Sequence, residues 1–190
     1  RGRRYKKRSV IYDKRGIIPN RTDISQRPPE VELRERFGDL EIDLIIGKNH
    51  KGAILTINDR ATGFGKLRKL DGKDAQQLAT ATIDCLMEWK PFLKTITSDN
   101  GKEFAGHTEI AKLFNLKTYF TTPYTSQEKG TVENRIGVIR RFFPKKTDLR
   151  NITNERIKQV ELSINNRPIR KFNYLSPIET LKNKFVALMS

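Results

Sequence analysis

Apolar and polar positions alternate along the middle of the chain in short runs that are typical of β-strands. Residues 40–46, 53–58 and 64–70 form three such runs, separated by short polar turns that contain glycine. Turns this short join antiparallel neighbours, so the runs predict a three-stranded meander. Residues 94–98 and 117–120 predict a fourth and a fifth strand.

Helical spacing of apolar residues begins after the third run. One apolar stripe predicts a long helix that Asp71 or Asp74 caps and Pro91 ends. The members of this stripe are Leu78, Thr82, Cys85, Leu86 and Trp89. Further helices are predicted at residues 104–115, 131–143, 154–166 and 176–187. The order of these elements predicts an α/β fold, with a five-stranded mixed sheet flanked by helices.

The chain divides into three regions of different composition. Residues 1–36 contain few apolar positions, and six of the first eight are Lys or Arg, so we predict a basic arm and linker. Residues 37–150 hold the five predicted strands and form a core domain, and residues 151–190 form a C-terminal helical extension. Because the chain begins with Arg1 rather than Met, we expect it to be part of a longer protein.

The charge of the chain indicates a polyanionic partner. Among its 190 residues, 38 are Lys or Arg and 22 are Asp or Glu, which gives a net charge of +16 and favours nucleic acid. The single cysteine, Cys85, excludes an internal disulfide and a multi-cysteine zinc site. No apolar stretch approaches the roughly 20 residues of a membrane span, and no secretory signal pattern is present.

Three carboxylates stand in a sequence context that is not typical of a solvated surface. Asp43 interrupts the apolar run of residues 40–46, where an unpaired charge costs several kcal/mol. Asp99 ends the fourth predicted strand and begins an Asp-Asn-Gly turn. Glu133 follows with 33 residues between them and lies one position off the apolar stripe of its predicted helix, about 100° around the axis.

Any one of these carboxylates alone is more often a structural or a solvated residue. Together, in this order and on a strongly basic chain, they favour a metal site. Divalent ions such as Mg²⁺ prefer oxygen ligands, and a pair of them can activate the nucleophile and stabilise the leaving oxygen of a phosphodiester. We therefore predict metal-dependent phosphoryl transfer on nucleic acid.

The segments around these carboxylates resemble the catalytic core of DDE transposases and retroviral integrases. The resemblance is carried by residues 38–43, 96–104 and 123–134, and residues 140–145 and 165–179 extend it. It runs from about residue 14 to about residue 181. The whole pattern, including the spacing of 33 residues, is most similar to the IS30 family of bacterial insertion-sequence transposases.

The resemblance implies an RNase H-like fold for the core domain. It also implies a catalytic triad of Asp43, Asp99 and Glu133 that binds two Mg²⁺ or Mn²⁺ ions, with the first aspartate bridging both. Leu40 stands where members of the family commonly have Trp, which leaves Asp39 as an alternative to Asp43. We prefer Asp43 because Asp39 lies outside the apolar run.

The same resemblance implies a substrate and a setting. Transposon ends would be cut, and the liberated 3′-hydroxyl would attack target DNA in a strand-transfer step during DNA integration. Two ends must be joined, so we expect at least a homo-oligomer on DNA. The resemblance further implies a bacterial cytoplasm, in association with the nucleoid and not with a membrane, and an N-terminal helix-turn-helix region that this chain lacks.

Basic and polar residues near the carboxylates are candidates for DNA contacts, because lysine and arginine neutralise phosphate. These candidates are Lys102, Tyr124, Gln127, Lys129, Arg135, Arg140, Arg141, Lys145 and Lys146. Glu128 is the nearest alternative to Glu133, but it lacks the helical apolar stripe. His50 and His107 have no partner at metal-ligand spacing, and we predict structural or surface roles for them.

Two other functions are compatible with the same residues. The first is a hydrolytic nuclease of the RNase H-like fold, which fold alone does not separate from a transposase. The second is a DNA-binding module that does not catalyse, and the presence of all three carboxylates disfavours it.

Overall fold

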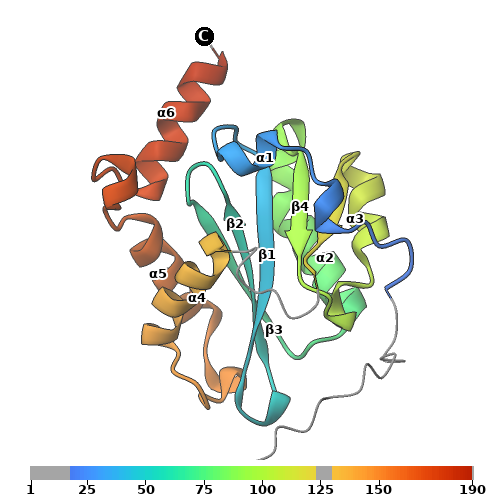
Figure 1. The fold of residues 1–190 in the computed structure, drawn as a ribbon. Helices are drawn as coiled ribbons and strands as arrows, with labels where there is room; N and C mark the ends of the chain where they lie inside the picture. The colour runs from blue at the N-terminus through green and yellow to red at the C-terminus, as the bar shows by residue number, and fades with distance from the viewer. Residues whose placement is uncertain (1–17, 123–129, 190) are drawn as a thin grey trace, which may run out of the picture.

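A five-stranded sheet forms the centre of the molecule (Figure 1). The computed structural model describes residues 18–122 and 130–189. The strands lie in the order β3-β2-β1-β4-β5. Their bounds are β1 (Asp39–Ile46), β2 (Ala53–Asp59), β3 (Gly65–Leu70), β4 (Thr95–Ser98) and β5 (Lys117–Phe120). The first three strands pair antiparallel, and β1, β4 and β5 pair parallel, so the predicted mixed sheet is confirmed.

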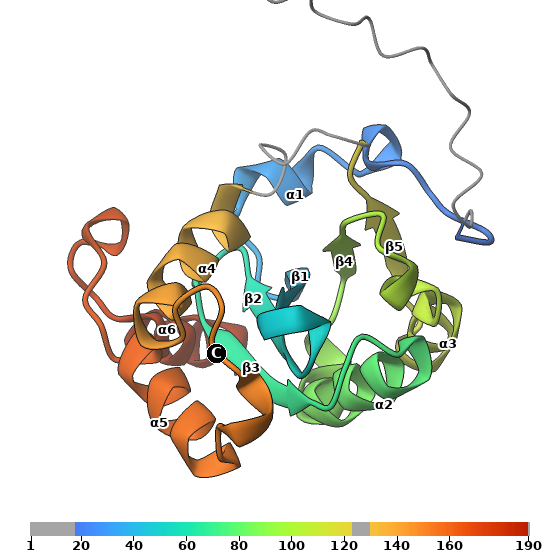
Figure 2. The same cartoon turned by 90° about the horizontal axis from the view of Figure 1, so that it is seen from below.

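Helices cover both faces of this sheet (Figure 2). The α-helices are α1 (Glu30–Leu33), α2 (Ala75–Leu86), α3 (His107–Phe114), α4 (Gly130–Phe142), α5 (Asn154–Asn165) and α6 (Pro177–Met189). Short 3₁₀ helices are η1 (Ile24–Gln26), η2 (Lys48–His50), η3 (Met87–Phe92), η4 (Lys102–Phe104), η6 (Leu149–Asn151) and η7 (Arg170–Phe172). None of the helices in the described part of the chain is long and apolar enough to cross a membrane.

Alternation along β1 divides the core into two clusters. Leu40, Ile42 and Leu44 point to one face, where they pack with residues of α2 and α3. Ile45 points to the other face and packs with Ile139 and other residues of α4 and α5. Because side chains of a strand alternate between faces, the acidic residues at odd positions of β1 share the face that α4 and α5 cover.

The described part of the predicted arm packs against the sheet. The Phe120 N–H donates to the Thr22 carbonyl at 2.9 Å, and Asp23 forms an isolated parallel bridge with Phe120. Val31 of α1 is fully buried. At the other end of the chain, Val160 of α5 is buried in the core cluster on β1. The division at residues 36 and 150 stays a prediction, and both flanking regions contribute to the packing.

Gly38 permits the entry into β1 and provides a test of the packing there. Its φ is +100°, and a Cβ at this position would overlap the carbonyl oxygen of Phe92. We expect Gly38→Ala to lower the free energy of unfolding by about 3 kcal/mol or more, because backbone strain adds to a clash with backbone. Urea denaturation measures the change. Gly72→Ala is the control, because nothing lies within 4 Å of its added methyl group; equal losses for both variants would contradict the argument.

Candidate active site

The pairing of β1 with β4 brings two of the predicted carboxylates to one level of the sheet. Glu41 pairs with Thr97 in parallel register. Continued by two residues, the register sets Asp43 level with Asp99, which directly follows the last residue of β4. Neighbouring strands lie about 4.8 Å apart, and residues two apart share a face. Asp43 therefore belongs to the sheet face that α4 and α5 cover, and Asp99 begins the turn that leaves β4 at the same level.

Backbone N–H groups fix the direction of both carboxylates. The Leu44 N–H donates to Oδ1 of Asp43 at 2.7 Å, and the Gly101 N–H donates to Oδ1 of Asp99 at 3.0 Å. The second contact forms an Asx-turn, which leads the chain out of β4. Asp43 is half-buried, the most exposed of the three acidic residues of β1.

Asn100 ties this turn to the rest of the fold. Its Nδ2 donates to the carbonyl of Thr121, just after β5, and its Oδ1 accepts from Nη1 of Arg21 at 2.6 Å. The Asp99 turn is therefore held between β5 and the chain that precedes α1. The Asp-Asn-Gly sequence indicated a turn, and the structure shows that the asparagine side chain anchors it.

The third predicted carboxylate, Glu133, lies in α4. This helix packs over β1, since its Ile139 and the following Phe143 belong to the cluster around Ile45. Nη2 of Arg140 also donates to the Ile46 carbonyl at 3.2 Å. The Glu133 side chain lies outside what the structure describes. Among the described side chains, no group of three or more His, Cys, Asp or Glu residues could hold a metal ion. The triad thus stays a prediction, of which the structure describes two members.

Asp39, the alternative to Asp43, is engaged in the fold. It is 1% exposed. Nε of Arg36 donates to its Oδ2 at 2.6 Å, and the Thr95 hydroxyl donates to its Oδ1 at 2.7 Å. The hydrogen bond to Asp39 raises the pKa of Arg36, so the guanidinium keeps its charge and the ion pair is maintained. With both oxygens bound in this way, Asp39 serves the packing of β1, and Asp43 remains the better candidate for a metal ligand.

A buried network of charges, which the sequence did not reveal, shares this face. Arg60 and Glu41 form an ion pair in which both side chains are fully buried. Nη2 of Arg60 also donates to Glu32 at 2.9 Å, and Glu32 in turn binds Arg27. Arg27 reaches the Thr97 hydroxyl at 2.9 Å. The sequence does contain one sign of this network. Acidic residues occupy every second position at the start of β1, which places charges on one face of a buried strand.

The predicted DNA contacts fall into three groups. Tyr124, Gln127 and Lys129 lie outside the described residues. Four others are exposed: Lys102 on η4, close in sequence to Asp99, and Arg141, Lys145 and Lys146 at and beyond the end of α4. Arg135 and Arg140 are partly buried, and burial lowers the pKa of both guanidinium groups, that of Arg135 to about 10. These roles stay predictions.

Of the two histidines, the structure buries one. Nδ1 of His107 lies 2.8 Å from the Thr118 hydroxyl, and its Nε2 lies 2.9 Å from the Pro19 carbonyl. These contacts give His107 a structural role in joining α3 to β5. His50 is exposed in η2.

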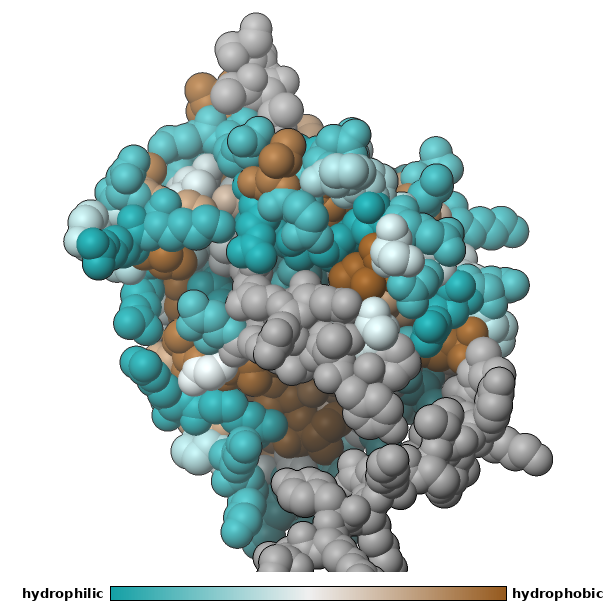
Figure 3. Space-filling model, viewed as in Figure 1, coloured by the Kyte–Doolittle hydropathy of each residue, from teal (hydrophilic) through white to brown (hydrophobic). Residues whose placement is uncertain are grey.

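Among the described residues, hydrophilic side chains make up most of the surface seen in Figure 3, which shows the side viewed in Figure 1. Apolar side chains reach this surface in smaller areas, mainly below its centre. Such a surface suits a polar ligand better than an extended apolar partner.

Comparison with known proteins finds similar transposases. No family model matches the chain. It is 54% identical over 181 residues to the transposase for insertion sequence element IS4351 of Bacteroides fragilis. This match covers 95% of this chain and 56% of that protein. It is 33% identical over 182 residues to transposase InsI for IS30C of Escherichia coli K12, covering 94% of this chain and 47% of that protein. The chain is a homologue of the IS30-type insertion-sequence transposases.

A solved structure supports the same fold. A chain of the simian T-cell lymphotropic virus intasome, solved in complex with PP2A regulatory subunit B56 gamma, superimposes with a TM-score of 0.64. The match covers 77% of this chain and 54% of that one, at 12% identity. The RNase H-like fold is therefore confirmed. The chain spans about half the length of the curated transposases that it matches.

Proposed function

We propose that this chain is the catalytic core of a DDE transposase, which cuts DNA at transposon ends and joins the ends to target DNA. The observation that carries the proposal is the parallel pairing of β1 with β4, which, continued by two residues beyond Glu41 and Thr97, brings Asp43 level with Asp99. The helix that bears Glu133, α4, packs over β1. Homology to insertion-sequence transposases over 95% of the chain supports it. A polynucleotidyl transfer would give Asp43 and Asp99 a role in a strongly basic chain.

Asp43, Asp99 and Glu133 are the residues that would hold Mg²⁺ or Mn²⁺. Carboxylate oxygens are the ligands that these ions prefer, so the donor set fits. Two bound ions would activate an oxygen nucleophile and stabilise the leaving oxygen. The protein's own part is to hold the carboxylates in place: the Leu44 and Gly101 N–H groups orient those of Asp43 and Asp99.

Basic residues around the carboxylates would position the DNA. Lys102 follows the Asp99 turn directly, where its ammonium can neutralise a phosphate close to the reacting one. Arg141, Lys145 and Lys146 extend a basic surface from the end of α4. The same site would act first with water and then with the 3′-hydroxyl of the cut strand, so at least two copies would assemble on the two ends, at the bacterial nucleoid.

Manganese located by anomalous diffraction tests the metal site. We expect crystals of the chain soaked in MnCl₂ to give a peak within about 2.0–2.4 Å of carboxylate oxygens of Asp43 and Asp99, the usual range for a hard divalent ion. Crystals soaked in CaCl₂ at the same concentration serve as the wavelength control. A map with no peak at these two residues, at a manganese concentration that saturates other sites, would contradict the proposed metal site.

A strand-transfer assay separates the transposase from a nuclease. The longer protein, incubated with labelled transposon-end DNA, target plasmid and MgCl₂, is expected to produce joined DNA and none in EDTA. Cleavage without joining would favour the hydrolytic nuclease. DNA binding with neither product would favour the non-catalytic DNA-binding module.

A further inference from the structure

A cleft of about 390 Å³ opens between α4, the sheet and the connection from α5 to α6. We call it the α4–α5 cleft. It lies beside the carboxylates already described and includes none of them among its described lining. The lining residues that bear on its chemistry are Asn58, Asn134, Arg135, Arg167, Lys171 and Phe172.

Every charged residue among the described lining of the α4–α5 cleft is cationic. Arg60 is neutralised from behind by Glu41 and Glu32. Within the described part of the chain, no ion pair includes Arg135, Arg167 or Lys171. The cleft therefore holds more positive charge than the described residues compensate, and this charge would attract an anion that enters it.

Arg135 lies deep in this cleft with a neutral partner. Its Nη2 donates to Oδ1 of Asn165 at 2.7 Å, and burial lowers its pKa to about 10. Burial also lowers the pKa of Lys171, and the charges of Arg34 and Arg60 add to this effect. Burial alone accounts for the lowered pKa of Arg135, whereas neighbouring cations add to the effect of burial at Lys171.

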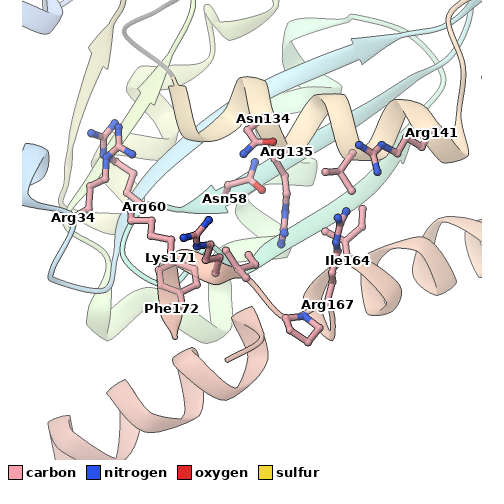
Figure 4. Close-up of a pocket in the computed structure, with 15 residues that line it drawn as sticks. Arg34, Asn58, Arg60, Asn134, Arg135, Arg141, Ile164, Arg167, Lys171 and Phe172 are labelled. Atoms are coloured by element: carbon pink, nitrogen blue, oxygen red, sulfur yellow. The ribbon is translucent and has the colours of Figure 1, made fainter. Parts of the chain in front are cut away.

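Asn58 contributes a buried donor without an acceptor. Its residue is 2% exposed, and its Nδ2 has no hydrogen-bond partner within the described part of the chain. A buried polar group left in this state costs about 1–3 kcal/mol. Figure 4 shows Asn58 next to Asn134 and Arg135 of α4, with Lys171 and Arg167 approaching from the α5–α6 connection. An acceptor oxygen in the cleft would satisfy this donor and the arginine together.

The cleft adjoins the candidate active site on the same sheet face. Asn58 pairs with Glu41, and Thr56 pairs with Asp43, so Asn58 lies two residues along the sheet from the pair that contains Asp43, on the same face. Two residues of a strand span about 7 Å. A DNA strand whose scissile phosphate lies at Asp43 would therefore bring neighbouring phosphates within reach of the cleft.

We propose that the α4–α5 cleft binds a phosphate group of the DNA strand that crosses the candidate active site. Arg167 and Lys171 contact it from the exposed rim, and Arg135 and Asn58 contact it from the floor. Arginine suits this role because its planar fork matches phosphate oxygens in pairs. The inference rests on the proposed function for its DNA substrate, and it adds a specific anchoring point for that substrate.

DNA binding without metal tests the cleft directly. Arg167→Gln/Lys171→Gln changes two exposed rim residues, and Lys112→Gln/Lys117→Gln removes the same charge from α3 and β5. Fluorescence anisotropy in EDTA with a labelled 30-base-pair duplex, over a salt series, measures the dissociation constant. We expect the rim variant to weaken binding about tenfold and to lower the salt slope by about one to two, against less than about twofold for the control.

Inorganic phosphate distinguishes DNA phosphate from a free phosphate compound. We expect phosphate to raise the melting temperature of the wild-type chain above that in NaCl of equal ionic strength, and the rim variant to lose this rise. If phosphate has this effect but the rim variant binds DNA normally, the cleft takes a free phosphate compound and its assignment to DNA is wrong. Equal DNA binding by both variants without any phosphate effect overturns the inference, as does a wild-type chain that does not bind DNA.

These readouts are independent of the proposed chemistry. A rim variant that loses DNA binding, in a protein that neither cuts nor joins DNA in MgCl₂, leaves the cleft in place and removes the transposase activity. If the wild type joins DNA and the rim variant binds DNA as well as the wild type does, the transposase activity stands and the assignment of the cleft is wrong.

Discussion

Asp43→Asn is expected to lower the rate of strand transfer in MgCl₂ by about 10³-fold or more in the longer protein. The amide keeps the shape of the side chain but loses the charge that holds a divalent ion, and such an ion contributes several kcal/mol to transition-state stabilisation. Asp43 is half-buried, so the substitution leaves the core intact. Asp99→Asn is expected to have the same effect, because an asparagine Oδ1 can still accept from the Gly101 N–H and keep the turn.

The measurement is the initial rate of joined product, with DNA binding in EDTA recorded for each variant. Asp84→Asn is the matched control, since its side chain on α2 is 57% exposed and lies on an element of the opposite face. We expect the control to keep the wild-type rate and all variants to keep DNA binding. An Asp43→Asn protein that retains more than a tenth of the wild-type rate would show that Asp43 is not a metal ligand.

The strands were predictable because alternation is a local signal. Each of the five predicted strands lies within one residue of its observed bounds, and β1 begins at Asp39. Two helices differ from their predictions, the first of them for a local reason. Pro91 cannot continue an α-helix, so α2 ends at Leu86 and the chain continues as η3.

The second difference follows from packing between elements. The segment before α3 forms a separate turn, η4, whose Phe104 is buried in the core with residues of α2. The α-helix therefore begins at His107. The spacing of apolar residues predicted one continuous helix here, and it gave no sign of the break between η4 and α3.

The candidate site depends on contacts that join distant parts of the chain. The parallel register of β1 with β4, continued by two residues beyond Glu41 and Thr97, sets Asp43 level with Asp99, and no local pattern specifies such a register. The sequence could identify Asp39 and Asp43 as acidic positions on a strand, but not their different environments. The burial of Asp39 and its contacts with Arg36 and Thr95 separate the structural aspartate from the candidate ligand.

The buried network is predicted to dominate the stability of this face. Arg60→Ala is expected to lower the free energy of unfolding by about 3–5 kcal/mol, because it leaves the Glu41 charge without its buried counter-ion. It also removes the donors to the Val31 carbonyl at 3.2 Å and to Glu32 at 2.9 Å. Urea denaturation followed by circular dichroism measures the change.

A matched pair of variants separates burial from charge. Arg68 and Asp84 form an ion pair at 3.9 Å with side chains 51% and 57% exposed, so Arg68→Ala is expected to change stability by less than about 1 kcal/mol. Glu41→Leu/Arg60→Met removes both buried charges and fills their space, so it is expected to lose less stability than Arg60→Ala alone. If Arg60→Ala and Arg68→Ala prove equally mild, Arg60 does not stabilise β1 through its charge. Another group would then have to compensate the buried charge of Glu41.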